Sequence, residues 1–162
     1  MPDTSEGVEM HLAEFNVGRL KARVDDARVK DFIDNLDRVN ALAERMPGFV
    51  WRLTGGGNNA IDLQFGDDPQ VIVNMSVWET AAQLETYVFG TLHAKFYRRR
   101  QEWFDLIERP HFVLWWVHEG HRPALAEAAE RLAHLAAHGP TEHAFGWAEA
   151  IGSERLQALR CA

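Results

Sequence analysis

The chain has 162 residues, the size of one domain, and 46% of them are hydrophobic, which is enough to build a core. Its formal net charge is −7 and its one dense basic run is Arg98 to Arg100, so nucleic acid is an unfavourable partner. A single cysteine, Cys161, excludes an internal disulfide and fits a reducing, cytoplasmic setting, and no apolar stretch of 18 residues predicts a membrane span.

The first predicted strand covers residues 10–20 and follows a polar segment, residues 1–9, that we expect to be disordered. Side chains alternate along it, with Ala13, Phe15 and Val17 on one face and Leu12, Glu14 and Asn16 on the other. Apolar residues then recur every three or four positions between Val29 and Met46, which predicts a helix that Pro47 and Gly48 end.

The middle of the chain predicts two strands and a second helix. A short strand is expected at residues 49–53 and a strong one at 70–77, with a glycine-rich loop between them. Ser76 and Glu79 have capping-box spacing, which favours a helix that begins at once and runs to Trp103. Gly90 is expected to bend this helix or divide it.

The last strand is predicted at residues 112–117, where a continuous apolar and aromatic run indicates cover on both faces. The sequence HEGHRP follows it, and a helix is expected from Pro123 to Gly139. The final segment, residues 148–162, has no clear assignment and is interpreted as a tail.

His118 and His121 of the HEGH sequence raise the question of a metal site. The zinc motif of metalloproteases needs two histidines four residues apart on a continuous helix, whereas these are three apart with a glycine between them. We therefore expect no metal at this corner. One imidazole could instead cap a helix end or bond a neighbouring backbone group, or His118 could contribute to a ligand pocket.

The predicted element order, β-α-β-β-α-β and then a helix, is typical of an α+β, ferredoxin-like fold with two helices on one face of an antiparallel sheet. One such domain is expected over residues 10–147. Polar and apolar residues alternate too weakly along these strands for one face of the sheet to be exposed to water. The second face of the sheet therefore needs a cover. Homodimerisation, sheet against sheet, is the simplest cover and predicts a homodimer.

Three polar residues, His93, Tyr97 and Asn74, are candidates for catalysis because they lie within or beside apolar surface. His93 lies inside the second helix, near Tyr97 on the same stripe, and is interpreted as a general base, a proximal haem ligand, or a hydrogen-bonded core or interface histidine. Asn74 interrupts an apolar strand, so its amide bonds either a substrate oxygen or a neighbouring strand.

Tryptophans are the candidates for contact with a flat, hydrophobic ligand. Adjacent Trp115 and Trp116 point to opposite faces of their strand, so one of them at most faces a given pocket. Core packing is the competing interpretation. The candidate ligand-binding residues are Trp51, Trp78, Trp103, Trp116 and His118.

Several blocks of sequence resemble, in order, those of a bacterial domain of unknown function within the dimeric α+β-barrel superfamily. They are PGFVWRL, VIVNMSVWET, HAKFYRRRQEWF, FVLWWVHEGHRP and LAHLAAHGPTEHAF. The resemblance covers residues 11–147 and implies a dimeric barrel with a pocket between sheet and helices. The wider superfamily includes cofactor-free antibiotic-biosynthesis monooxygenases, haem-degrading enzymes and haem proteins. His118 departs from the pattern, which has proline there.

Three functions stay open at this point. The first, implied mainly by the resemblance, is a small-molecule enzyme of the monooxygenase type, without a cofactor or metal, acting on an aromatic or polyketide-like hydrophobic compound. The alternative is a non-catalytic homodimer that binds a small ligand or has a structural role. The third is a haem protein that uses His93.

Overall fold

The computed structural model describes residues 9–161 of the chain, so all but the last residue of the segment predicted to be disordered, residues 1–9, lie outside the described part. The strands are β1 (Met10–Arg19), β2 (Phe49–Arg52), β3 (Val71–Trp78) and β4 (Phe112–His118). The helices are the 3-10 turn η1 (Ala27–Val29), α1 (Lys30–Arg45), α2 (Ala81–Gly90), α3 (Leu92–Arg98), α4 (Arg100–Trp103), α5 (Leu125–His138), α6 (Trp147–Ile151) and α7 (Ser153–Cys161).

The four strands form one antiparallel sheet in the order β2-β3-β1-β4, which confirms the predicted α+β, ferredoxin-like arrangement. β1 and β3 lie in the centre. Their register places Glu14 opposite Ser76 and Asn16 opposite Asn74, so these four residues share one face. Phe145 pairs with Leu114 through two backbone hydrogen bonds and so protects part of the free edge of β4.

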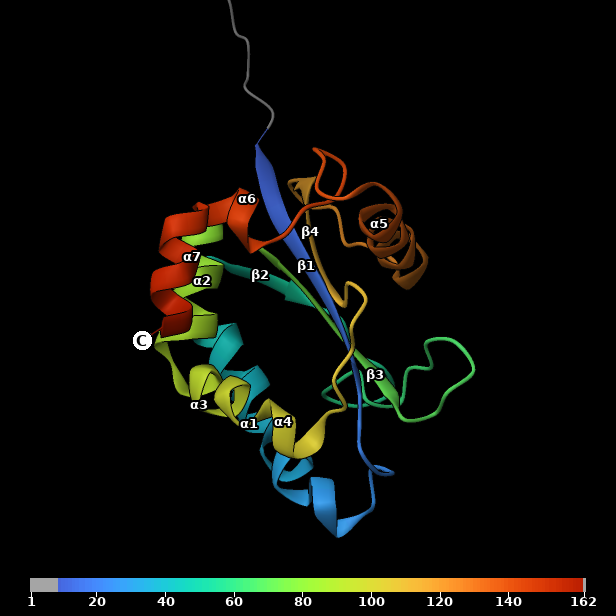
Figure 1. Cartoon of the computed structure of the whole chain (residues 1–162). Helices are drawn as coiled ribbons and strands as arrows, with labels where there is room; N and C mark the ends of the chain where they lie inside the picture. The colour runs from blue at the N-terminus through green and yellow to red at the C-terminus, as the bar shows by residue number, and fades with distance from the viewer. Residues whose placement is uncertain (1–8, 162) are drawn as a thin grey trace, which may run out of the picture.

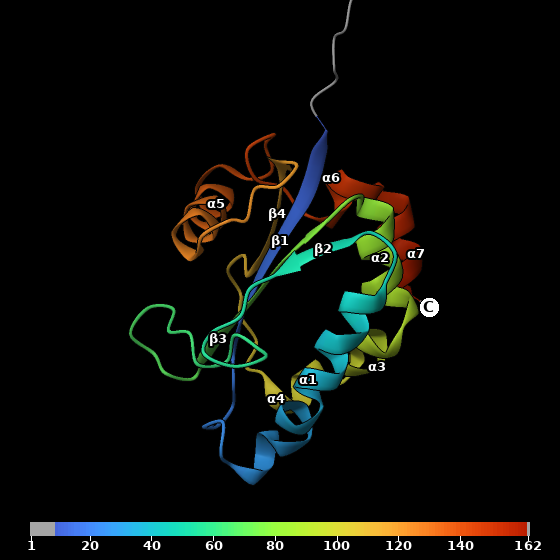
Figure 2. The ribbon, with the colours of Figure 1, turned by 180° about the vertical axis from the view of Figure 1, so that it is seen from behind.

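Most helices cover one face of the sheet: α1 to α4, α6 and α7 lie together on one side of it (Figures 1 and 2). Leu12, Trp78 and Leu114 of the sheet pack there against the apolar stripe of α1 and against α2. Asp26 helps to start α1, because its carboxylate accepts a hydrogen bond from the backbone N–H of Arg28 in the preceding turn η1.

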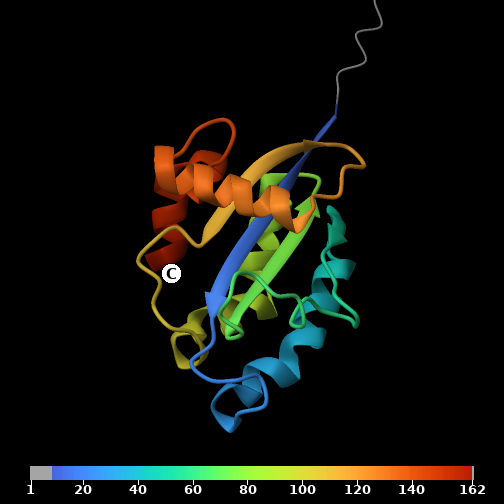
Figure 3. The ribbon, with the colours of Figure 1, turned by 90° about the vertical axis from the view of Figure 1, so that its right-hand side faces the viewer.

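The opposite face is covered by the chain itself. Helix α5 crosses it (Figure 3), and Leu63 and Phe65 of the loop between β2 and β3 pack against the same cluster. Phe15, Met75 and Trp115 are fully buried beneath them. The expectation that a second copy must cover this face is therefore wrong, because α5 and the loop already cover it. The homodimer itself stays a prediction.

The predicted second helix is three separate helices, because the chain breaks after Gly90 and again at Arg99. Thr91 caps the new helix α3: its Oγ1 accepts a hydrogen bond from the His93 N–H and donates one to the Tyr87 carbonyl. The predicted capping box at Ser76 and Glu79 is wrong. Ser76 still belongs to β3, and Thr80 is the cap of α2, accepting a hydrogen bond from the N–H of Gln83.

The segment interpreted as a tail folds into α6 and α7 and packs on the helical layer. Leu156 of α7 is buried, and the Arg155 guanidinium forms an ion pair with Glu85, a buried carboxylate of α2. Among the residues that the structure describes, no helix is long and apolar enough to cross a membrane.

Candidate functional site

The helix-covered face of the sheet carries a group of polar side chains at its centre. β1 contributes Glu14 and Asn16, and β3 contributes Asn74 and Ser76. These four residues, named the Glu14 cluster below, are adjacent because the antiparallel register pairs them and every second residue of a strand points to the same face.

Glu14 is the centre of this cluster and is only 4% exposed. Its carboxyl group accepts hydrogen bonds from Ser76 Oγ at 2.8 Å and from Asn16 Nδ2 at 3.1 Å, and a longer contact of 3.5 Å comes from Asn74 Nδ2. Asn74 is exposed although it lies on a central strand of the covered face. The helical layer therefore leaves the sheet open over Asn74, directly beside the buried carboxyl group.

Burial raises the pKa of Glu14 from its ordinary 4.5 to about 7, and the hydrogen bonds from Ser76 and Asn16 only partly oppose this rise. The three neighbours are neutral, so none of them supplies the positive charge that would keep the carboxylate ionised. A carboxyl group with a pKa near 7 is present in both protonation states at neutral pH. It can therefore take up a proton and release it again.

Aromatic rings lead from the Glu14 cluster into the helical layer. Trp78 Nε1 donates a hydrogen bond to Ser76 Oγ, and its ring stacks on Tyr87 of α2 with centroids 5.2 Å apart. The Tyr87 ring lies 4.9 Å from the His93 ring. Burial, and next the negative charge of Glu14, raise the pKa of Tyr87, so its hydroxyl stays protonated and donates to the Val39 carbonyl.

His93, a predicted catalytic residue, is half-buried at the start of α3. Its Nδ1 lies 3.1 Å from the Val88 carbonyl oxygen, which can only accept, so Nδ1 carries the proton and Nε2 keeps its lone pair. Burial lowers the pKa of His93 and keeps the ring neutral. Tyr97 is exposed, and the Arg100 guanidinium lies 4.2 Å above its ring. The structure thus places His93 along the contacts that lead to Glu14, and the Tyr97 ring stacks on the outer side of His93 with centroids 6.4 Å apart.

The predicted tryptophans lie in different parts of the molecule. Trp78 belongs to the cluster beneath α1 and α2, whereas Trp51 packs against the cluster under α5. Trp103 lies in a third cluster, beneath the Arg99 guanidinium. Trp116 faces the helical side but is 42% exposed near Phe145. They are spread over several clusters rather than gathered at one place, and the contact of any one of them with a ligand stays a prediction.

The HEGH sequence forms a corner, as expected from Gly120, which has a φ of +85°. His121 Nε2 bonds the Glu127 carboxylate at 2.7 Å, and His118 is exposed. Both histidines line an open groove of about 260 Å³, whose other lining residues are Met10, Trp116, Val117, Glu127 and Arg131. A second groove, of about 470 Å³, lies between α1 and α3, and neither groove includes Glu14, Asn74 or His93.

Sequence reasoning identified Asn74 and His93 but not Glu14, and it assigned Ser76 to a helix cap. A signal was present, since Glu14 and Asn16 share one face of a strand whose other face is apolar. Only the pairing of β1 with β3 shows that Asn74 lies next to Glu14 and Asn16 on this face.

The sequence matches one known protein family over most of its length. Residues 11–161 match the model of a family described as a domain of unknown function, DUF3291. The chain belongs to the DUF3291 family. This confirms the resemblance to a family of unknown function, and the DUF3291 match continues past residue 147 through α6 and α7.

Two solved structures from Nitrosomonas europaea are similar to this DUF3291 chain. The first is NE2512, a protein of unknown function, at 15% identity and a TM-score of 0.47, over 73% of this chain and 97% of that one. The second is a "putative antibiotic biosynthesis monooxygenase" at 16% identity and a TM-score of 0.44, over 70% and 91%. No curated protein matches the chain. Structural similarities this weak do not assign an activity to this chain.

Proposed function

We propose that this protein is a small-molecule enzyme in which Glu14 acts as a general base. The observation that carries the proposal is a buried carboxyl group with a pKa of about 7 beside an exposed amide on the same face of the sheet. General bases work best when their pKa lies near the operating pH, and most carboxyl groups ionise well below neutrality.

The residues around Glu14 suggest how a substrate would bind. The amides of Asn16 and Asn74 offer N–H groups to a substrate oxygen, next to the carboxyl group that takes the proton. Phe112 of β4 lies on the same face and stacks on Trp147 at a centroid distance of 5.5 Å. This mixture of an apolar aromatic surface and a few polar groups suits a hydrophobic aromatic compound with an acidic hydroxyl or C–H group.

The monooxygenase form of this proposal adds molecular oxygen as the second substrate. Removal of a proton from a phenol or an activated C–H group gives an electron-rich anion, which can transfer electrons to oxygen without a cofactor. Oxygen then bonds to the electron-rich carbon as a peroxide, and cleavage of the O–O bond leaves one oxygen atom on that carbon as a carbonyl and releases the other as water, so that CH₂ and O₂ give C=O and H₂O. The chain's part is to bind the compound, to take its proton on Glu14 and to hold the resulting oxyanion with Asn16 or Asn74. Every residue in this scheme comes from one chain, so the scheme does not require the predicted homodimer.

A second candidate, haem binding through His93, is favoured by one observation. The hydrogen bond from Nδ1 to the Val88 carbonyl leaves Nε2 free as a ligand atom, the usual arrangement of a metal-binding histidine. An absorption spectrum of the purified protein with added haem tests it. A Soret band that is lost in His93→Gln supports this candidate, and unchanged spectra of wild type and variant remove it.

The test of the main proposal is oxygen uptake by the purified protein with a panel of polycyclic phenols. Glu14→Gln keeps the size of the side chain but removes the titrating group, so we expect turnover to fall by about 10²-fold or more. Glu85→Gln is the matched control because Glu85 is the other buried carboxylate among the described residues, paired with Arg155 on the outer helices. Its turnover should stay close to wild type. Equal activity of Glu14→Gln and wild type would contradict the proposal.

A further inference from the structure

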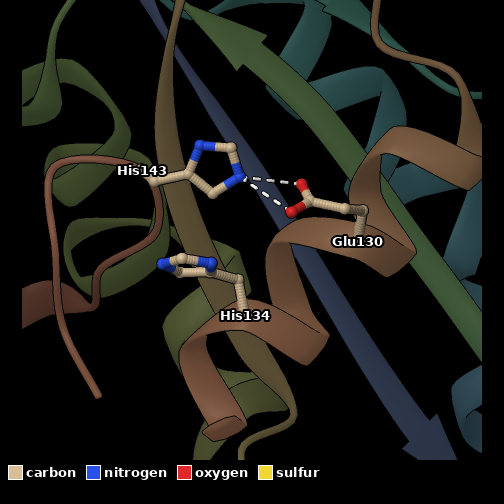
Figure 4. A group of neighbouring side chains, drawn as sticks. All are labelled: Glu130, His134 and His143. Carbon is tan, nitrogen blue, oxygen red and sulfur yellow. Dashed lines mark hydrogen bonds and ion pairs between the residues drawn. The ribbon is translucent and has the colours of Figure 1, made fainter. Parts of the chain in front are cut away.

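A second group of chemically capable side chains lies on the other side of the sheet, on α5 and the loop that follows it. Glu130, His134 and His143 each offer one donor atom, and these three atoms all lie within 4.8 Å of one another (Figure 4). Glu130 and His134 are one helical turn apart, so they project from the same face of α5. His138 continues this stripe by another turn, and its ring centroid lies 4.4 Å from that of His134.

The loop after α5 is built so that His143 returns over this stripe. Gly139 ends the helix with a φ of +72°, a conformation that residues with a Cβ rarely adopt. Thr141 then closes a turn, because its N–H donates to the Ala144 carbonyl and its Oγ1 accepts from the N–H of His143. The backbone pairing of Phe145 with Leu114 of β4 fixes the next residues to the sheet.

The hydrogen bonds of His143 show where its proton is. Arg131 Nη1 can only donate, and it lies 2.9 Å from His143 Nδ1 and 2.7 Å from the His143 carbonyl oxygen. Nδ1 is therefore an acceptor, and Nε2 carries the proton, which it donates to the Glu130 carboxylate at 2.8 and 2.9 Å. A proton thus lies between a carboxylate and an imidazole, which are both ligands of divalent metals.

We propose that Glu130, His134 and His143 bind a divalent cation of the Zn²⁺ type, which takes the position now held by the proton on His143 Nε2. The site is separate from the Glu14 cluster, and the proposal does not depend on the function proposed above. It also departs from the expectation, drawn from the sequence, that the chain has no metal ligands. The HEGH corner is not part of it.

The donor set selects the class of metal. Two imidazole nitrogens and one carboxylate oxygen suit Zn²⁺ and its neighbours Co²⁺ and Ni²⁺ better than Ca²⁺ or Mg²⁺, which prefer oxygen ligands only. In a tetrahedral Zn²⁺ site with bonds of about 2.0–2.1 Å, donor atoms lie roughly 3.4 Å apart. The three donor atoms now lie within 4.8 Å of one another, so metal binding requires side-chain rotations that bring them closer. The fourth position is then left for the exposed His138 or for water.

Arg131 opposes the cation and so provides a specific test. When Nε2 binds a metal, the single ring proton of neutral His143 moves from Nε2 to Nδ1, so Nδ1 becomes a donor and the Arg131 guanidinium must leave that atom. Glu127 lies 3.9 Å from Arg131 Nη2 and can receive the guanidinium. Replacing Arg131 by a neutral residue removes both the competing hydrogen bond and a positive charge, so it should tighten metal binding.

The experiment titrates the full chain with Zn²⁺ alone, by calorimetry and by competition with a chromophoric chelator, and records the visible spectrum with Co²⁺. We expect one ion per chain and an intense tetrahedral Co²⁺ spectrum. His134→Gln and His143→Gln should each weaken binding by about tenfold or more. The double variant His118→Ala/His121→Ala, at the nearby corner, is the control and should bind as wild type does.

Arg131→Gln should bind Zn²⁺ several-fold more tightly than wild type, and circular dichroism of every variant checks that the helices are intact. Absence of stoichiometric binding by the wild type at roughly 100 μM Zn²⁺, an affinity near −5.5 kcal/mol, would overturn the proposal. Binding that survives in a folded His134→Gln/His143→Gln double variant, or that is lost only in the corner variant, would overturn it equally.

Discussion

A carboxyl group at the centre of a sheet has few ways to be stable. Glu14 is buried among Ser76, Asn16 and Asn74, which donate hydrogen bonds but carry no charge. Removal of an ionised carboxylate from water costs several kcal/mol without a cation, so the group binds its proton more tightly instead. This shift is a cost that a purely structural residue such as Gln would avoid, and it is the reason for assigning Glu14 a chemical role.

Ser76 is the residue whose removal should disturb this arrangement most. Its hydroxyl donates to Glu14 and accepts from Trp78 Nε1, both within the buried part of the cluster. Ser76→Ala leaves two buried polar groups without that partner, and we expect a loss of about 1–3 kcal/mol in the free energy of unfolding. Urea denaturation followed by tryptophan fluorescence measures it.

Asn74→Ala is the matched comparison, because Asn74 lies on the same strand but is exposed and makes only a 3.5 Å contact with Glu14. Its loss should stay below about 1 kcal/mol. Equal losses in the two variants would show that the Ser76 hydrogen bonds do not stabilise the folded chain.

The sequence predicted the side-chain alternation of β1 correctly, including Glu14 and Asn16 on the face opposite Phe15. The cluster itself was not predictable, because it depends on which strands pair and in which register. The positions of the tryptophans were not predictable for a related reason: hydrophobicity predicts that a ring is buried, but it does not say in which of several clusters. Trp51, Trp78 and Trp103 are accordingly in three different ones.

At the scale of elements, the break after Gly90 determines where His93 lies. A continuous helix would place His93 on the stripe expected from its spacing, whereas a new helix that begins at Leu92 turns the ring back toward Tyr87 and the Val88 carbonyl. Glycine and a capping threonine both favour such a break. The sequence indicated the place of the break but not the new direction of the chain.

Thr91→Ala should weaken this break. It removes the hydrogen bonds of Oγ1 to the His93 N–H and to the Tyr87 carbonyl, and the loss of an N-cap typically costs about 1 kcal/mol. Thr86→Ala is the control, since Thr86 is exposed in the interior of α2 and bonds only the Ala82 carbonyl. We expect thermal unfolding to shift down for Thr91→Ala and to stay near wild type for Thr86→Ala; a larger shift for Thr86→Ala would contradict this interpretation.

For the molecule as a whole, the order of elements was enough to predict the ferredoxin-like sheet, since few topologies accommodate that order. It was not enough to predict which face α5 covers. The periodicity of α5 shows an apolar stripe without saying what it contacts, and the continuous apolar run of β4 is explained equally well by a second copy or by a helix of the same chain. In the structure that helix is α5, above the buried Trp115.

The free energy of unfolding of the whole chain should depend on pH because of Glu14. Its pKa is raised to about 7 in the folded chain from an ordinary 4.5, so the folded state holds a proton that the unfolded chain releases first. The stabilisation from this proton is complete below pH 4.5 and is lost as the pH rises to 7. The loss amounts to about 3 kcal/mol for a shift of this size.

Glu14→Gln should lack this part of the pH dependence. The unfolding free energies of wild type and variant, measured from pH 4.5 to 8, should therefore diverge by that amount, with the variant gaining relative to wild type as the pH rises. Two parallel curves would contradict a raised pKa at Glu14.

The most direct measurement is the titration of the Glu14 carboxyl carbon by NMR, in protein labelled with ¹³C at the glutamate side chains and assigned with Glu14→Gln. We expect this resonance to titrate with a midpoint near 7, well above the ordinary 4.5 of a glutamate side chain. A midpoint near 4.5 for Glu14 would contradict its role as a base poised for proton transfer at neutral pH, and with it the function proposed for the face beneath the helices.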